Sequence, residues 1–171
     1  MKLATGLLFT EKQIQQRVAE IAAQIDADYR GKTLVICGIL KGCIPFLSDL
    51  MRRLTGDVRL ALIEMKSMVD GQHASMKFTS SLDLSGKHVL IVEDIVDTGI
   101  TLDYLIKHLE VERTPASIRV AALLDKPEAR KLDVPVHYRG FTVPDKFVVG
   151  YGLDWQERYR NLPYITWVES E

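Results

Sequence analysis

Residues 89–102 read VLIVEDIVDTGITL, and this stretch decides the fold that the chain is expected to adopt. Its first half is a run of apolar, often β-branched residues, which is typical of a strand buried on both faces. A short polar loop over residues 93–99 follows, and a segment with helical spacing runs from Ile100 to Glu112. A buried strand that leads through a loop into a helix is the repeating unit of parallel α/β sheets.

The rest of the chain alternates in the same way between apolar strands and helices. Thr10 and Gln13 fit the capping box of an N-terminal helix, and a second helix is predicted over residues 44–54. Further strands are predicted over residues 33–40, 58–65, 87–93, 117–124 and 147–149. The polar residues 66–81 are expected to form one long loop, a length that is typical of functional segments. The pattern predicts an α/β fold with a central parallel sheet flanked by helices. The N-terminal residues and the segment after about residue 126 are expected to form a small lobe.

Composition and charge limit the class of protein. The 171 residues, 47% of them apolar, suit one domain with a packed core. Lys and Arg number 22 against 23 Asp and Glu, so charge gives no reason to expect nucleic acid or a membrane as partner. No apolar run approaches the roughly 20 residues of a membrane span, and no signal peptide is evident, so we expect a cytoplasmic protein. Cys37 and Cys43 lack zinc-ligand spacing and are expected to be structural thiols.

The loop within residues 89–102 carries groups that suit a sugar phosphate. Three small or hydroxyl residues stand where the helix begins: Thr98, Gly99 and Thr101. N–H groups and the helix dipole favour a phosphate at such a helix start. Three carboxylates precede it within five residues: Glu93, Asp94 and Asp97. Carboxylates repel a phosphate unless a divalent cation bridges them or sugar hydroxyls donate to them, so the loop indicates a sugar phosphate, with Mg²⁺ as the candidate cation. The alternative is an acidic loop in which Asp97 or Thr98 only caps the helix.

Several stretches, taken together and in order, make the chain similar to the hypoxanthine/guanine phosphoribosyltransferases of the type I phosphoribosyltransferase family. Residues 93–102 (EDIVDTGITL) resemble that family's phosphoribosyl-pyrophosphate motif. The other matching stretches are Leu40-Lys41-Gly42 (the pyrophosphate loop), Lys66-Ser67 (the mobile loop), residues 123–126 and 144–154 (the purine site) and Arg160. The resemblance covers about residues 10–165 and implies one domain over residues 1–171 with the type I fold and a small hood lobe.

The resemblance also implies a reaction. The family transfers the 5-phosphoribosyl group from phosphoribosyl pyrophosphate to N9 of a 6-oxopurine, hypoxanthine or guanine, and releases pyrophosphate in purine salvage. Asp97 would be the catalytic base or proton acceptor that faces N7 of the purine. The purine would be read by three residues: Lys126 through O6, Phe147 by stacking and the Val148 backbone near C2.

The resemblance assigns the remaining ligands in the same way. The 5-phosphate would lie on Thr98, Gly99 and Thr101, and the ribose hydroxyls on Glu93 and Asp94. Pyrophosphate would bind Lys41, Gly42 and Arg160, with Ser67 in the mobile loop. In the family the peptide at the pyrophosphate loop is often a non-proline cis bond. Mg²⁺ would be held by Asp154, Glu93 and Asp94. The family forms homodimers and homotetramers.

Two positions depart from the family pattern, and other interpretations stay open. Ile100 stands where some relatives carry Lys, and Met68 where relatives usually carry Tyr in the closing loop. Lys126 with Phe147 favours a 6-oxopurine without ranking hypoxanthine, guanine and xanthine. A xanthine or pyrimidine phosphoribosyltransferase is the rival enzyme. A nucleic-acid-binding regulator with this fold is the rival class, which the near-neutral charge disfavours. The chain lacks the G-x4-G-K-[ST] motif of a P-loop kinase.

Overall fold

The computed structural model describes residues 2–66, 75–78 and 82–169. The strands of its large sheet are β2 (Leu34–Leu40), β3 (Val58–Lys66), β4 (Ser75–Phe78), β5 (His88–Val96), β6 (Ser117–Asp125) and β7 (Tyr138–Thr142). Their order is β4-β3-β2-β5-β6-β7, and all neighbours are parallel except β4, which is antiparallel to β3. The predicted central parallel sheet is confirmed.

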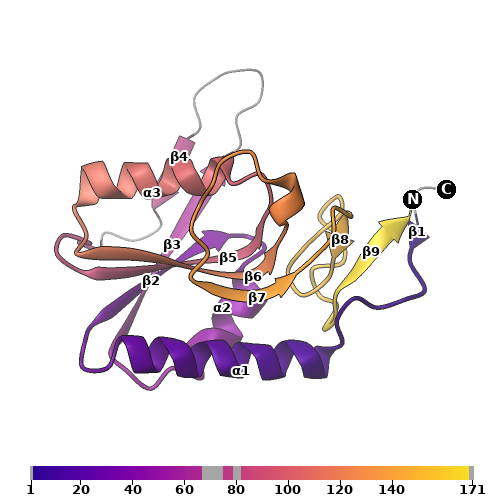
Figure 1. The fold of residues 1–171 in the computed structure, drawn as a ribbon, viewed down its shortest axis with the longest axis horizontal. Helices are drawn as coiled ribbons and strands as arrows, with labels where there is room; N and C mark the ends of the chain where they lie inside the picture. The colour runs from indigo at the N-terminus through magenta and orange to yellow at the C-terminus, as the bar shows by residue number, and fades with distance from the viewer. Residues whose placement is uncertain (1, 67–74, 79–81, 170–171) are drawn as a thin grey trace.

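Helices cover both faces of this sheet. Helices α1 (Glu11–Asp28) and α2 (Ile44–Met51) lie on one face, and α3 (Ile100–Arg113) lies on the other (Figure 1). Successive residues of each strand point to opposite faces. Ile36 therefore packs in the core with α1 and α2, and its neighbour Cys37 packs in the core with α3. Burying one such aliphatic side chain contributes about 1.5–3 kcal/mol. Both cysteines are free and buried, as expected.

The strand order contains a switch point between β2 and β5. From β2 the chain continues to β3 on one side, and β5 then pairs with the opposite side of β2. The loops that leave β2 and β5 therefore diverge, and the crevice between them at the carboxyl ends is where open α/β sheets bind ligands. Residues 41–43 follow β2 and residues 97–99 follow β5, so both sequence-predicted anion-binding loops lie at this crevice.

A second, smaller sheet lies beside the carboxyl edge of the first. It consists of β1 (Lys2–Leu3), β8 (Val148–Val149) and β9 (Thr166–Glu169), in the antiparallel order β1-β9-β8. Figure 1 shows the first and last described residues together at this end of the molecule. A 3₁₀ helix (Pro127–Ala129) follows β6. No helix among the described residues is long and apolar enough to cross a membrane.

Several elements differ from the sequence prediction. The fifth parallel strand is β7, and residues 148–149 belong instead to the small sheet. β7 was missed because it is an edge strand with an exposed Arg and a Gly, so it lacks a continuous apolar run. β4 lies inside the predicted long loop, where polar sequence hides an edge strand. The second helix ends at Met51 rather than residue 54. The capping box of Thr10 and Gln13 is confirmed.

Candidate active site

Three loops far apart in sequence meet at the switch point. A Cβ atom added to Gly42, after β2, would lie 1.6 Å from Oδ2 of Asp94 on β5. A Cβ added to Gly152, after β8, would lie 2.0 Å from the carbonyl oxygen of Gly42, and Gly152 also has a φ of +102°. Neither position has room for a larger residue. The sequence thus brings the predicted pyrophosphate loop against the acidic end of β5, with the 150–153 loop packed on it.

Two partly buried carboxylates, Glu93 and Asp94, form the floor of this crevice. The sequence predicted that both residues lie in a loop, but β5 continues to Val96, so both lie within the strand, near its carboxyl end. Oε2 of Glu93 is buried and has no hydrogen-bond partner. Burial, and then the neighbouring Asp94 charge, raise the pKa of Glu93 well above its ordinary value. Burial likewise raises the pKa of Asp94 to about 6, although backbone N–H groups and Arg160 oppose this shift. A cation or hydroxyl donors beside this pair would stabilise its charged form.

The loop after β5 is the predicted phosphate loop. Thr98, Gly99 and Thr101, together with Glu93 and Asp97, line a cavity of about 90 Å³. Helix α3 begins after Gly99, whose φ is +82° and which has no side chain to cap the helix. The N–H of Ile100, the first helical residue, donates to the Thr98 hydroxyl at 3.4 Å. Of the two residues in the alternative interpretation, Asp97 or Thr98 as a helix cap, Thr98 therefore does contact the start of the helix.

The conformation of the phosphate loop depends on its packing against the segment after β6. A Cβ on Gly99 would lie 2.5 Å from the carbonyl oxygen of Leu132. The carbonyl of Thr98 accepts N–H bonds from Lys131 and Leu132 at 2.9 and 3.1 Å. A residue larger than glycine would push the loop away from this support.

Charged groups gather on the pyrophosphate side of the crevice. The Leu40–Lys41 peptide is cis, as the resemblance implied. Nη1 of Arg160 donates to the carbonyl of Gly152 at 2.8 Å, and Nη2 pairs with Oδ1 of Asp154 at 2.8 Å. Nε of Arg160 is buried without a partner. Of the positions assigned to pyrophosphate and its magnesium ion, the structure brings together Gly42, Asp154 and Arg160. Ser67, like Met68, lies outside the described residues.

The predicted base-reading residues lie at the ends of β6 and β8. Lys126 is buried, and its Nζ lies 3.5 Å from Oδ1 of Asp145. Its backbone N–H donates to the carbonyl of Val96 at 3.0 Å, which ties it to the end of β5. Phe147 is 54% exposed beside the buried Val148, so its ring is not a core side chain. An exposed ring and a buried ammonium at one edge suit a planar, polar ligand.

Sequence reasoning missed one buried acid in this region. Asp125, the last residue of β6, is 1% exposed and forms ion pairs with Arg130 and, at 2.6 Å, with Arg139. It holds the segment that supports both Lys126 and the phosphate loop. The signal in the sequence was an Asp directly after a predicted apolar strand. The sequence prediction gave a role to the adjacent Lys126 and none to Asp125.

The acidic residues fit a magnesium ion that is shared with a substrate. Among the described residues, no three or more His, Cys, Asp or Glu side chains cluster as a metal site of their own. Mg²⁺ usually binds one or two carboxylates and completes its shell with water and substrate phosphates. The unpartnered Oε2 of Glu93 and the raised pKa of Asp94 suit such a shared cation. Asp154 accepts bonds from Arg160 and from the N–H of Glu157, and its oxygens keep lone pairs for a metal.

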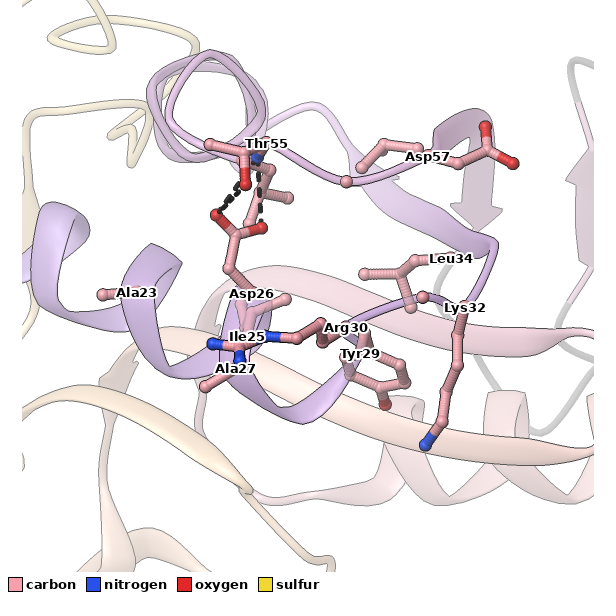
Figure 2. Close-up of a pocket in the computed structure, with 14 residues that line it drawn as sticks. Ala23, Ile25, Asp26, Ala27, Tyr29, Arg30, Lys32, Leu34, Thr55 and Asp57 are labelled. Carbon is pink, nitrogen blue, oxygen red and sulfur yellow. Dashed lines mark hydrogen bonds between the residues drawn. The ribbon is translucent and has the colours of Figure 1, made fainter.

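A larger cavity, of about 490 Å³, lies at the opposite edge of the sheet, where β2 and β3 begin (Figure 2). Asp26 reaches into its wall and accepts the N–H of Thr55 at 3.1 Å and the Thr55 hydroxyl at 2.9 Å (Figure 2). Asp57 accepts the hydroxyl of Thr33 at 2.7 Å. These carboxylates are satisfied within the fold, and the one buried side-chain atom of this cavity without a partner in the described part of the chain is the neutral hydroxyl of Tyr29. With no buried and unpaired charged group among the described residues of its wall, the larger cavity is the weaker candidate for a site that binds a charged ligand.

Comparisons with known proteins agree with this geometry. A family model described as "Phosphoribosyl transferase domain" matches residues 7–156. A Streptococcus pneumoniae protein named hypoxanthine-guanine phosphoribosyltransferase is 41% identical, over 96% of this chain and 93% of the relative. A Haemophilus influenzae protein named hypoxanthine phosphoribosyltransferase is 42% identical, over 93% and 92%. A mutant hypoxanthine phosphoribosyltransferase from Trypanosoma cruzi, solved as a ternary substrates complex, is similar in structure with a TM-score of 0.91 and 38% identity, over 98% and 96%.

Proposed function

Since the chain belongs to the phosphoribosyl transferase family, we propose that it transfers the 5-phosphoribosyl group from phosphoribosyl pyrophosphate to N9 of a 6-oxopurine. The chain has the type I phosphoribosyltransferase fold and acts in purine salvage, with hypoxanthine or guanine as the base. The observation that carries the proposal is the buried, unpartnered Oε2 of Glu93, which lies beside Asp94 at the switch point. These acids require hydroxyl donors and a cation, and a ribose pyrophosphate with Mg²⁺ supplies both.

The sugar and its phosphate occupy the end of β5 in this proposal. Thr98, Gly99 and Thr101 bind the 5-phosphate through N–H groups and hydroxyls at the start of α3. Glu93 and Asp94 accept the ribose 2- and 3-hydroxyls. The bond from C1 to pyrophosphate breaks early in such a transfer, so the sugar resembles an oxocarbenium ion, as in glycoside chemistry. Acids held at this position then keep the sugar fixed while its positive charge develops.

The base occupies the exposed side of the same edge. Phe147 stacks on the purine, Lys126 donates to O6, and the Val148 backbone reads the C2 position. Asp97 takes up the proton at N7 while N9 attacks C1 of the ribose. A site that donates to O6 disfavours adenine, because the 6-amino group of adenine offers the ammonium a donor where a 6-oxopurine offers an acceptor. The burial of Lys126 supports this role, since its ammonium, paired with Asp145 at 3.5 Å, has donors left for a ligand oxygen.

Pyrophosphate leaves toward the 150–160 segment. Gly42 and the Lys41 backbone bind it through N–H groups, and Arg160 adds positive charge. Ser67, which lies outside the described residues, stays a pyrophosphate contact predicted from the sequence. Asp154, with Glu93 and Asp94, would hold Mg²⁺, which when bound would neutralise the charge of the departing pyrophosphate. The unpartnered Nε of Arg160 supports an anionic ligand at this position.

The proposal covers the whole chain as one unit. Residues 1–171 act as a single domain, with the β1-β9-β8 sheet as the hood over the purine. A homodimer or homotetramer and a cytoplasmic location stay predictions from the sequence.

The test is product analysis with phosphoribosyl pyrophosphate, Mg²⁺ and each of hypoxanthine, guanine, xanthine and adenine. We expect nucleotide and pyrophosphate from hypoxanthine or guanine and none from adenine. Nucleotide from xanthine alone would move the chain to the rival enzyme. If no base yields nucleotide, the proposal fails.

A further inference from the structure

Glu157 lies in a tight turn whose left-handed backbone is strained for any residue with a side chain. Trp155 and Arg158 exchange both N–H···O bonds, at 3.1 and 3.0 Å, so Gln156 and Glu157 are the two central residues of a hairpin turn. Both have left-handed φ angles, 53° and 63°. Two-residue turns of this hand favour Asn followed by Gly, because a Cβ is strained in the left-handed region. Glu157 therefore stands where glycine is the residue that best suits the backbone.

The turn directs the Glu157 carboxylate between two cations. Its Oε2 lies 3.0 Å from Nζ of Lys41, and its Oε1 lies 3.0 Å from Nη2 of Arg160. The N–H of Glu157 donates to Oδ2 of Asp154 at 2.8 Å, which fixes the turn against the same cluster. One carboxylate thus joins the loop after β2 to the segment after β8. Hydrogen bonds from Lys41 and then Arg160 lower the pKa of Glu157, so the group is an anion at neutral pH.

Lys41 and Arg160 belong to the segments assigned above to pyrophosphate, so the Glu157 carboxylate lies where that ligand is expected. We propose that Glu157 is an internal anion that occupies part of the pyrophosphate subsite in the free protein and competes with pyrophosphate for Arg160, while the Lys41 ammonium helps to hold it there. The inference rests on the proposed function. Pyrophosphate cannot pair fully with Arg160 while the carboxylate holds Nη2, and a second anion beside Glu157 would be repelled. Binding of the ligand therefore includes displacement of the Glu157 side chain.

A surface ion pair that only stabilises the fold does not account for this arrangement. The Glu157 side chain is 65% exposed and that of Lys41 is 62% exposed, and exposed pairs contribute little to stability. The left-handed backbone works against any such gain. The geometry is instead that of an exchangeable group, since an exposed carboxylate on a surface turn can swing away without unpacking the core.

The test compares substitutions within this one turn by the affinity for inorganic pyrophosphate in the presence of Mg²⁺, measured by calorimetry on the full chain. Glu157→Gln keeps the shape and removes the charge, and Glu157→Gly also relieves the backbone. Gln156→Gly is the matched control, because it relieves the same turn and keeps the carboxylate. We expect both Glu157 variants to bind pyrophosphate about three- to tenfold more tightly, the range that loss of exposed ion pairs allows, and the control to bind like the parent.

Product inhibition gives a second readout that a structural role would not move. Both Glu157 variants should show a lower KM for phosphoribosyl pyrophosphate and stronger inhibition by pyrophosphate, with a thermal midpoint no lower than that of the parent. If Gln156→Gly tightens pyrophosphate binding equally, the effect comes from the backbone and the inference is overturned.

Arg160→Gln separates failure of this inference from failure of the proposed function. If Arg160→Gln weakens pyrophosphate binding while Glu157→Gln leaves it unchanged or weaker, the subsite stands and the role of Glu157 is wrong. If neither substitution changes the affinity, the assignment of pyrophosphate to this segment fails as well, and the inference fails with it.

Discussion

The parallel strands begin at one side of the sheet, the amino edge, and end at the other, the carboxyl edge. These two sides differ in how their polar groups are paired. At the amino edge, the carboxylates of Asp26 and Asp57 accept hydrogen bonds from nearby threonines around a cavity of about 490 Å³. At the carboxyl edge, Glu93 Oε2, which lines a cavity of only about 90 Å³, and Arg160 Nε are buried without partners among the described residues. The larger cavity also has one buried atom without a partner, the neutral hydroxyl of Tyr29, whereas the unpaired atoms at the carboxyl edge belong to a carboxylate and a guanidinium.

This difference favours the carboxyl edge as the ligand site, although its cavity is the smaller of the two. A fold tolerates buried polar atoms without partners only at a cost, so such atoms point to a ligand that completes them. The tight glycines add to this contrast. A Cβ on Gly42 would overlap Asp94, whereas a Cβ on Gly56 at the amino edge would meet nothing within 4 Å.

The largest effect is expected for Asp97→Asn at the carboxyl edge. Removal of the proton acceptor at N7 should lower kcat by about 10² to 10⁴, the usual contribution of a positioned base. Binding of phosphoribosyl pyrophosphate should change much less, because Asn keeps the shape of the loop. Steady-state kinetics and calorimetry on the same variant give the two quantities, and unchanged turnover would remove Asp97 from its role.

Gly42→Ala should come next, with a loss of about a hundredfold in kcat/KM for phosphoribosyl pyrophosphate. The new Cβ must displace the Asp94 carboxylate, and a shift of about 1 Å in a positioned group costs about that much. Gly56→Ala is the control at the amino edge, where the added methyl has open space. Comparable losses in both variants would mean that the two edges do not differ in this respect.

The sequence predicted the carboxyl edge only where a strand or a helix leaves a local pattern of apolar residues. The 89–102 stretch predicted the existence and order of β5, the phosphate loop and α3, and the start of α3 at Ile100, because a buried strand and a helix each leave a periodic apolar signature. The contact of Gly152 with Gly42 and the turn that carries Glu157 were not predicted, because they arise from packing between loops more than 100 residues apart. The end of β5 was also misplaced, since charged residues usually end a buried strand and here Glu93 and Asp94 continue it.

Asp94→Asn should separate stability from function at the carboxyl edge. The pKa of Asp94 is about 6 in the folded chain, against about 3.9 when unfolded, so the folded state holds its proton longer. The folded state is therefore destabilised as pH rises from about 4 to 6, and the full penalty persists above that window. The neutral variant should be more stable than the parent by about 1–3 kcal/mol at pH 8, a range that allows for partial exposure, and no more stable at pH 4.

Urea unfolding of the ligand-free protein at both pH values measures this change. The same variant should bind Mg²⁺ and phosphoribosyl pyrophosphate more weakly, because it loses an acceptor for the ribose hydroxyls. A stability gain that is equal at both pH values would contradict burial of the charge as its cause.

The smallest effect is expected at the amino edge, for Asp26→Ala. This change removes the acceptor of the Thr55 N–H and hydroxyl, and the loss of such bonds should lower the free energy of unfolding by about 1 kcal/mol. kcat and KM should match those of the parent. A kinetic defect as large as that of Gly42→Ala would give the amino-edge cavity a part in the reaction.

The most direct test is to observe which edge the substrate occupies. Backbone amide chemical shifts of the isotope-labelled protein, followed by NMR during titration with phosphoribosyl pyrophosphate and Mg²⁺, report on both edges in one experiment. The account predicts that the amides of Gly42 and of residues 97–101 shift strongly, while those of residues 55–58 stay within experimental error. The largest shifts at residues 55–58, with residues 97–101 unmoved, would contradict it and would place the substrate in the larger cavity at the amino edge.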